Sequence, residues 1–217
     1  MCFFGCGLQP ESFEVSWDSE VITLQRMFDP GCSPAMYRIQ GKSFAFPDLT
    51  SEPCPNCRAD FLKRHGFYGR HLIAPGFEGE IMIRRFCCRR CGRTVSLLPS
   101  FCHPLRSYGL LAVFGILSEF YVKESAACLA AGDFMASTGV ACSRQLLLHY
   151  RRRIEGNLNG VIMAVTEIRG LRAPPVTERF DTRKRVRQLL SSILSPQDCS
   201  LKMFELTKTT YLTPQAI

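Results

Sequence analysis

Apolar residues in the second half of the chain recur at the spacing of helices. Between residues 108 and 121 they lie on nearly every side of the predicted helix, which indicates a helix buried in a core. A shorter Ala-rich helix is predicted over residues 125–131, where Gly132 is expected to stop it, and a second stretch of small residues runs to Gly139.

Two further helices are predicted nearer the end of the chain. Ser143 can cap a helix that continues to residue 155, with apolar residues on one side and Arg on the other. After a linker marked by Pro174 and Pro175, residues 181–194 form an amphipathic pattern with basic residues on its polar face.

The middle of the chain follows the period of β-strands instead. Residues 61–73 are interrupted at Gly66 and Gly69, which predicts two short strands around a turn. Residues 80–86 alternate in part, with Ile81 and Ile83 facing one way, and residues 94–98 can pair back before Pro99. Residues 14–26 fit a strand or a short helix equally well.

Composition and charge indicate a class of partner only through the distribution of the charged residues along the chain. The chain has 217 residues, 46% of them hydrophobic, so one ordinary domain with a smaller module is expected to fold. Of the net charge of +8, residues 54–93 hold 9 basic and 3 acidic side chains, whereas residues 1–53 hold 3 and 7. A cationic surface of this kind attracts polyanions, although the same charge also serves solubility.

The 12 cysteines change the picture more. The first residues lack the cationic and apolar regions of a signal peptide, so we expect reduced thiols, a cytoplasmic location and metal binding rather than disulfides. The longest apolar run, residues 110–117, is far below the roughly 20 residues that cross a bilayer, so no membrane partner is expected.

Two Cys-x-x-Cys pairs, 30 residues apart, are the strongest motif in the chain. Two thiolates at that spacing bind one ion from a tight turn, and two such turns complete a tetrahedron, which predicts a closed, structural Zn²⁺ site. The predicted ligands are Cys54, Cys57, Cys88 and Cys91.

The remaining cysteines and histidines are given simpler roles. Cys87 is expected to point away from the site, and Cys2, Cys6 and Cys32 are read as spare buried thiols. The histidines that could replace a ligand are expected in the hairpin or on the surface: His65, His71 and His103.

Basic residues lie close to this motif, and others lie on the helix that Ser143 caps. Interleaved with aromatics such as Phe67, the first group can hold a phosphate backbone, although a solvated face would look the same. On the helix, Arg144 or Gln145 could reach base edges if residues 125–155 form a helix-turn-helix. The predicted nucleic-acid contacts are Lys63, Arg64, Arg70, Arg84, Arg89, Arg90, Arg93, Arg144, Gln145, Arg151 and Arg152.

The expected fold class is therefore α+β, a small β zinc ribbon followed by an α-helical region with a candidate helix-turn-helix. The predicted divisions are an N-terminal segment of unknown fold (1–53), the ribbon (54–104), the helical region (105–165), and a linker with a basic C-terminal helix (166–217).

The run over residues 54–104 resembles an uncharacterised bacterial zinc-ribbon domain that accompanies insertion-sequence transposases. The resemblance is carried by CPNC, RHGFYGRH and IRRFCCRRCGRTVSLLPSF. It implies a ribbon that binds metal through the four cysteines and contacts nucleic acid. We therefore expect a zinc-dependent protein that binds double-stranded DNA and is associated with, or derived from, a transposase.

No enzymatic activity is expected. Strand transfer usually needs three carboxylates on a large α/β domain, and Asp133, Glu155, Asp181 and Asp198 lie in no such context. Two other functions remain open. The paired motifs also resemble rubredoxin, an iron electron carrier, and the ribbon with its apolar helices could instead be a module that binds a partner protein.

Overall fold

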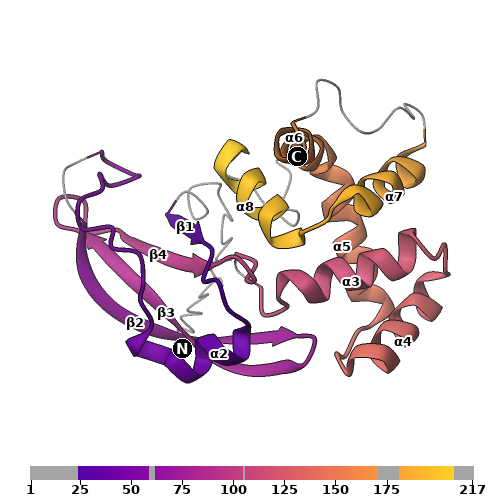
Figure 1. Cartoon of the computed structure of the whole chain (residues 1–217), viewed down its shortest axis with the longest axis horizontal. Helices are drawn as coiled ribbons and strands as arrows, with labels where there is room; N and C mark the ends of the chain where they lie inside the picture. Colours follow the sequence, from indigo (N-terminus) through magenta and orange to yellow (C-terminus); the bar gives the residue numbers. More distant parts are fainter. Residues whose placement is uncertain (1–23, 59–61, 105, 171–180, 208–217) are drawn as a thin grey trace, which may run out of the picture.

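The computed structural model describes residues 24–58, 62–104, 106–170 and 181–207. Figure 1 shows a β-sheet at one end of the molecule and a body of helices at the other. Several sequence predictions fall outside the described residues: those for Cys2, Cys6, Pro174 and Pro175. The segment 14–26, for which strand and helix were both open, is described only from residue 24, and a strand begins at Gln25. The fold is of the α+β class, as predicted.

The sheet contains four strands in the order β1-β4-β3-β2. Strands β2, β3 and β4 are antiparallel neighbours, whereas β1 pairs in parallel with β4. The strand that joins from the N-terminal segment therefore extends the sheet of the ribbon. The bounds are Gln25–Phe28 (β1), Leu62–Ala74 (β2), Phe77–Cys88 (β3) and Thr94–Pro99 (β4).

The prediction of two short strands over residues 61–73 is wrong, because β2 is one continuous strand of 13 residues. Gly66 lies beside a register shift and has φ of 109°, so it serves a β-bulge rather than a turn. Gly69 makes room for the side chain of Glu80, whose atoms approach to 2.3 Å of an added Cβ. The hairpin turn comes later, at Gly76, which has φ of 70°. The predicted strands in β3 and β4 are confirmed.

A short helix covers β3. Helix α2 spans Pro34–Gln40 and continues into a 3₁₀ turn, η1, at Gly41–Ser43. Tyr37 on α2 is fully buried, and its hydroxyl donates a hydrogen bond to the carbonyl of Met82 on β3 (2.9 Å). From η1 the chain runs along the β2–β3 hairpin toward the cysteine turns (Figure 1).

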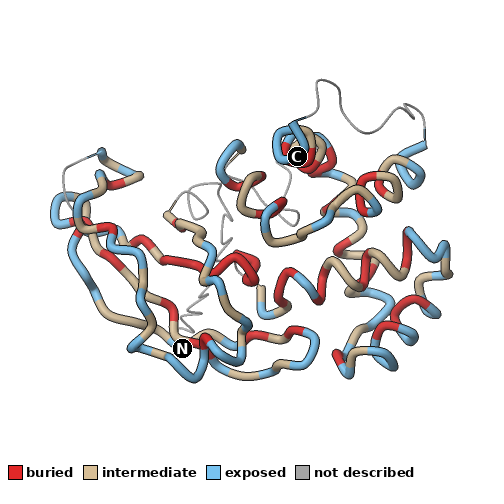
Figure 2. The backbone as a smooth tube through the Cα atoms, viewed as in Figure 1, coloured by how far each residue is buried: buried red, intermediate tan, exposed pale blue. Residues whose placement is uncertain are grey.

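Helix α3, Leu110–Tyr121, is the central helix of the other body. It is buried at positions all along its length, as Figure 2 shows, so the predicted core helix is confirmed. The segment before it is tied to the sheet, because the N–H of Ile73 donates to Ser107 and that of Gly109 donates to Ile73.

The prediction that Gly132 ends a helix is wrong, since α4 spans Ala127–Thr138 and ends at Gly139. A glycine inside a helix costs about 1 kcal/mol relative to Ala. Two residues further on, Phe134 is only 2% exposed, and burying such a ring contributes about 1.5–3 kcal/mol. Packing of Phe134 therefore outweighs the local preference.

Helix α5, Arg144–Gly156, begins as predicted, with the Ser143 hydroxyl accepting from the N–H of Leu146 (3.1 Å). Residues 139–143 join α4 to α5, and the Tyr108 hydroxyl donates to the carbonyl of Ala141 in this turn (2.8 Å). Both helices pack against α3. Helices α4 and α5 also contact each other, and their assignment as a helix-turn-helix stays a prediction.

Three more helices belong to this body in the described part of the chain. Helix α7, Thr182–Ser192, confirms the predicted amphipathic helix, and Asp181 caps it. Helices α6, Leu158–Ile168, and α8, Pro196–Thr207, were not predicted separately, and they pack against each other. None of the helices that the structure describes is both long and apolar enough to span a bilayer.

Candidate metal centre

Two tight turns at the end of the sheet carry the four predicted ligands. In the first, the N–H of Arg58 donates to the carbonyl of Cys54 (2.9 Å), and Arg58 has φ of 57°. In the second, the N–H of Gly92 donates to the carbonyl of Cys88 (3.0 Å), and Gly92 has φ of 71°. Gly92 is thus at a position where L side chains are strained.

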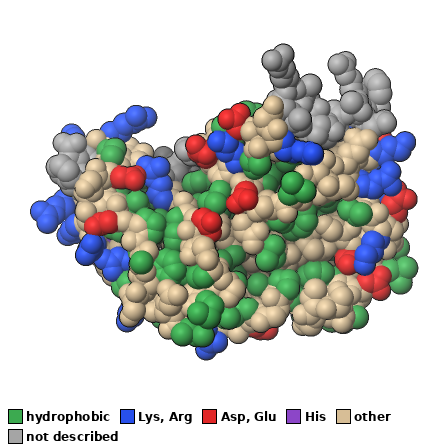
Figure 3. Space-filling view, viewed as in Figure 1, with side chains coloured by type: hydrophobic (Ala, Val, Ile, Leu, Met, Phe, Trp, Pro, Cys, Tyr) green, Lys and Arg blue, Asp and Glu red, His purple; other side chains and the backbone are tan. Residues whose placement is uncertain are grey.

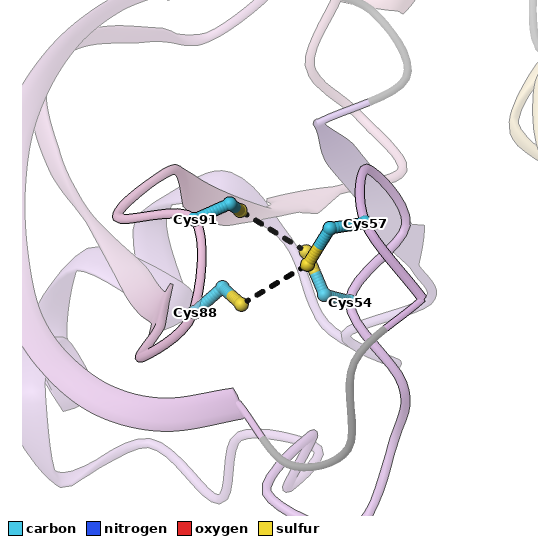
Figure 4. A group of neighbouring side chains, drawn as sticks. All are labelled: Cys54, Cys57, Cys88 and Cys91. Carbon is cyan, nitrogen blue, oxygen red and sulfur yellow. Dashed lines mark hydrogen bonds between the residues drawn. The ribbon is translucent and has the colours of Figure 1, made fainter.

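The four sulfur atoms converge, as Figure 4 shows. All lie within 4.8 Å of one another, with Cys54 Sγ 3.7 Å from Cys91 Sγ and Cys57 Sγ 3.6 Å from Cys88 Sγ. A tetrahedral Zn²⁺ with Zn–S bonds of about 2.3 Å separates its sulfurs by about 3.8 Å. The donor set therefore fits one metal ion, and the two distances are far too long for S–S bonds of about 2.05 Å.

The surroundings of these thiols favour the thiolate form. A hydrogen bond from the backbone of Arg93 is the main cause that lowers the pKa of Cys91 to about 6. Backbone hydrogen bonds from Cys91 and, less strongly, Arg90 lower the pKa of Cys88 in the same way. Metal ions bind cysteine as thiolate, so these amides prepare the second turn for coordination.

Cys87 does not join the cluster. Its Sγ lies 3.5 Å from the carbonyl oxygen of Gly92 and 3.6 Å from that of Cys88, and the side chain is half-buried. Cys32 is also half-buried. Among the described residues, the four converging cysteines are the group of His, Cys, Asp or Glu side chains that could hold a metal ion.

The histidines differ in their settings. His65 and His71 are exposed on the hairpin as expected, with His71 Nε2 3.3 Å from a carboxylate oxygen of Glu78. The surface position expected for His103 is wrong, because this side chain is fully buried. Burial, together with the nearby guanidinium groups of Arg70 and Arg106, lowers the pKa of His103 to about 3.

The predicted nucleic-acid contacts of the ribbon differ in their exposure and in the partners of their side chains. Lys63, Arg89, Arg90 and Arg93 are exposed, and Lys and Arg side chains gather at this end of the molecule (Figure 3). Arg64 is exposed but paired with Asp48 (2.7 Å). Arg70 instead turns inward and donates to the carbonyls of His103 and Arg106.

On α5, the predicted contacts Arg144, Gln145 and Arg152 are exposed. Arg151 is half-buried and bonded to Glu155, with Nε 3.0 Å from the carboxylate, and its guanidinium lies 5.7 Å from the centre of the Phe120 ring. Figure 1 places α5 and the cysteine turns at opposite ends of the molecule. The predicted contacts therefore form two separate surfaces.

The four carboxylates considered for catalysis lie on or at the start of four different helices. Glu155 accepts hydrogen bonds from Tyr121 and Arg151, and Asp181 caps α7. Asp133 and Asp198 are exposed on α4 and in the first turn of α8.

Sequence reasoning overlooked one group of residues beside the hairpin. Lys42, Phe44 and Phe46 line a surface pocket together with Arg64 and Arg84. In the sequence, the only indication of this group is the alternation of Phe44 and Phe46 after Lys42. The other lining residues, such as Arg64 and Arg84, are far away in the chain.

The fold and the site define an α+β protein with a four-cysteine candidate metal centre at the end of its sheet. A family model described as a domain of unknown function, DUF6431, matches residues 54–131. The match starts at the first cysteine ligand and extends through α3 into α4. It confirms the predicted resemblance to an uncharacterised domain family, while the association with transposases stays a prediction. Comparisons with curated proteins and with solved structures found no match.

Proposed function

We propose that this chain is a zinc-dependent protein that binds double-stranded DNA, of the accessory kind that accompanies transposases and has no catalytic domain of its own. The convergence of Cys54, Cys57, Cys88 and Cys91 within 4.8 Å is the observation that supports the proposal best. One Zn²⁺ held there would be closed to substrate and would order the turn that presents Arg89, Arg90 and Arg93.

Charge and exposure support DNA as the partner. Every phosphate that a Lys or Arg neutralises releases a counterion, so exposed arginines at a metal-ordered turn favour binding to a polyanion. On the second surface, Arg144 and Gln145 are exposed in the first turn of α5, the position from which a recognition helix contacts base edges. The resemblance of residues 54–104 to domains that accompany transposases supports the finer assignment.

Metal analysis and duplex binding test the proposal together. The purified chain should contain one zinc ion and bind a mixed-sequence duplex, and log Kd should rise steeply with log salt concentration. Replacing Arg89, Arg90 and Arg93 together by Ala should reduce the salt slope by about 2.7, because each phosphate contact contributes about 0.9. The control removes three exposed basic side chains elsewhere, Lys123, Arg169 and Lys184, and should lower the slope much less.

Other results for the bound metal or for duplex binding would favour a different function. Iron in place of zinc, with a red colour, would favour an electron carrier, because the same four thiolates fit iron. If the zinc-loaded protein does not bind DNA at low salt, a function in binding another protein is favoured. Exposed apolar residues on α4, Leu129 (61% exposed) and Met135 (49%), offer a surface for that function.

A further inference from the structure

A surface pocket of about 270 Å³ lies between the segment after α2 and the β2–β3 hairpin, and none of its lining residues is a cysteine. Its lining combines cations and rings: Lys42, Phe44, Phe46, Arg64, Arg84 and Phe86. The segment reaches this place because it runs along the hairpin from η1 toward the first cysteine turn (Figure 1). Residues more than 15 positions apart in the chain are therefore joined in one concave site.

One side of the pocket is aromatic. The ring of Phe46 lies 5.1 Å from that of Phe44 and 5.4 Å from that of Phe67, measured between centroids. Phe44 and Phe46 line the pocket, and they and the neighbouring Phe67 are half-buried, so each of these residues keeps part of its surface exposed. Partly exposed rings of this kind are platforms on which a planar ligand stacks.

The other side of the pocket is cationic. The guanidinium carbon of Arg84 lies 4.7 Å from the centre of the Phe67 ring and 5.7 Å from that of Phe86, which holds this charge against the aromatic side. Arg64 is bonded to Asp48, and Lys42 is exposed. The lining thus holds three cationic side chains and one carboxylate, that of Asp48, so its net charge is positive and favours an anionic ligand.

A ligand that carries a planar ring and, a short distance away, an anionic group fits both sides of the pocket at once. The ring would contact the aromatic side and the anion the cationic side. In duplex DNA the faces of the bases are covered by their neighbours, whereas an unpaired nucleotide presents a free face and a phosphate. The pocket is slightly smaller than the roughly 300–1,000 Å³ typical of sites for larger ligands. It therefore suits a single base rather than an extended ligand.

We propose that this pocket binds one unpaired nucleotide of single-stranded DNA, with the base against Phe46 and Phe44 and the phosphate near Lys42 and Arg64. This inference deepens the proposed nucleic-acid function and adds a second form of DNA to it. Arg64 and Arg84 would then serve both sites, because the strands that carry them lead toward the cysteine turns.

The test uses fluorescence anisotropy to measure binding of the full zinc-loaded chain to two labelled ligands. One is an oligothymidine of ten nucleotides, and the other is a duplex. Phe46→Leu removes the ring but keeps an apolar side chain for the core, so it should weaken oligothymidine binding roughly tenfold and leave duplex binding within about twofold. Lys42→Gln should weaken oligothymidine binding less and reduce its salt slope by about 0.7.

Controls separate the pocket from general effects. Phe204→Leu replaces a buried ring on α8, and Lys123→Gln removes an exposed charge beyond α3; both should bind oligothymidine like the original chain. Zinc content and circular dichroism establish that each variant is folded. Lys42 is exposed, so the Lys42→Gln result stands even if Phe46→Leu does not fold.

The outcomes are distinct from those of the duplex experiment. Oligothymidine binding that is equal in the original chain, Phe46→Leu and Lys42→Gln would overturn the inference, as would its absence in the original chain. Sensitivity of oligothymidine binding to Phe46→Leu without any duplex binding would keep the pocket and reject duplex DNA as partner. Competition by free thymidine monophosphate, lost in Phe46→Leu, would also support the pocket and would identify the nucleotide unit itself as the ligand.

Discussion

At the scale of single residues, adjacent cysteines have different settings. Cys88 is buried and contributes its sulfur to the four-cysteine cluster, whereas Cys87 lies outside the cluster. Alternation along a strand sends neighbouring side chains to opposite faces, which explains why the two thiols separate. The pair therefore provides a matched test of the metal centre.

We expect Cys88→Ser to abolish stoichiometric metal binding, because a hydroxyl is a poor replacement for a thiolate in a four-sulfur site. The ends of β3 and β4 would lose their crosslink to the first turn, so the melting temperature should fall by several degrees or more. Elemental analysis and thermal unfolding measure both effects. Cys87→Ser should retain one metal ion per chain, and loss of metal in that variant as well would contradict the assigned ligand set.

His103 provides a pH-dependent contribution to stability. Its pKa is lowered to about 3 in the fold, against 6.5 ordinarily, so the unfolded chain binds a proton that the folded chain does not. The favourable contribution is present above pH 6.5 and is lost as the pH falls toward 3. At pH 4.5 the loss amounts to about 2–3 kcal/mol.

We therefore expect His103→Gln to reduce the difference in unfolding free energy between pH 7 and pH 4.5, measured by urea denaturation with zinc in excess at both values. The comparison uses the change with pH, because the substitution also alters packing at both. His71→Gln is the control, since His71 is exposed. A pH dependence of His103→Gln equal to that of the original chain would show that this side chain is not kept neutral.

At the scale of elements, two glycines on neighbouring helices have opposite roles. Gly132 in α4 is exposed, and a Cβ there would meet no atom within 4 Å. Gly115 in α3 faces Phe134, and a Cβ there would lie 2.6 Å from a ring carbon of this buried side chain. Helix propensity decides the first position, and close packing decides the second.

We expect Gly132→Ala to stabilise the protein by about 0.5–1 kcal/mol, because it lowers the entropy of the unfolded chain without creating a clash. The same substitution at Gly115 should destabilise it by about 1–3 kcal/mol, since Phe134 has little space to move. Urea denaturation measures both. Equal effects of the two substitutions would contradict the close contact between α3 and α4.

At the scale of the whole molecule, elements outside the region that matches the family model pack against both its sheet and its main helix. Its strand β4 is paired on one side by β1, which comes before the matched residues. Its helix α3 packs against α5, α7 and α8, which come after them. Leu117 and Phe120 of α3 are 1% and 5% exposed in the complete arrangement.

A fragment of residues 54–131 should therefore keep its four cysteines but fold poorly even with zinc, because the apolar face of α3 would be open to water. Near-ultraviolet circular dichroism and gel filtration should show weak tertiary structure and association of the fragment. A compact, monomeric fragment with a cooperative melting transition would instead show that the ribbon and α3 stabilise each other without the flanking elements.

The sequence by itself determined the features that depend on neighbours in the chain. The spacing within each Cys-x-x-Cys pair places two sulfurs on one turn, Ser143 caps α5 through a contact three residues away, and the apolar pattern of α3 already implies burial. These features are local, so their physical cause can be read from a short window of residues. The candidate metal ligands and most of the described helices were predictable for this reason.

Only the tertiary structure decided which distant segments meet. It pairs β1 with β4 about 70 residues further along, buries His103 beside Arg70, and brings Phe44 and Phe46 to Arg84. It also carries α4 through Gly132, since the burial of Phe134 outweighs a local preference. Such outcomes depend on contacts between residues far apart in the chain, whose free energies no local pattern contains.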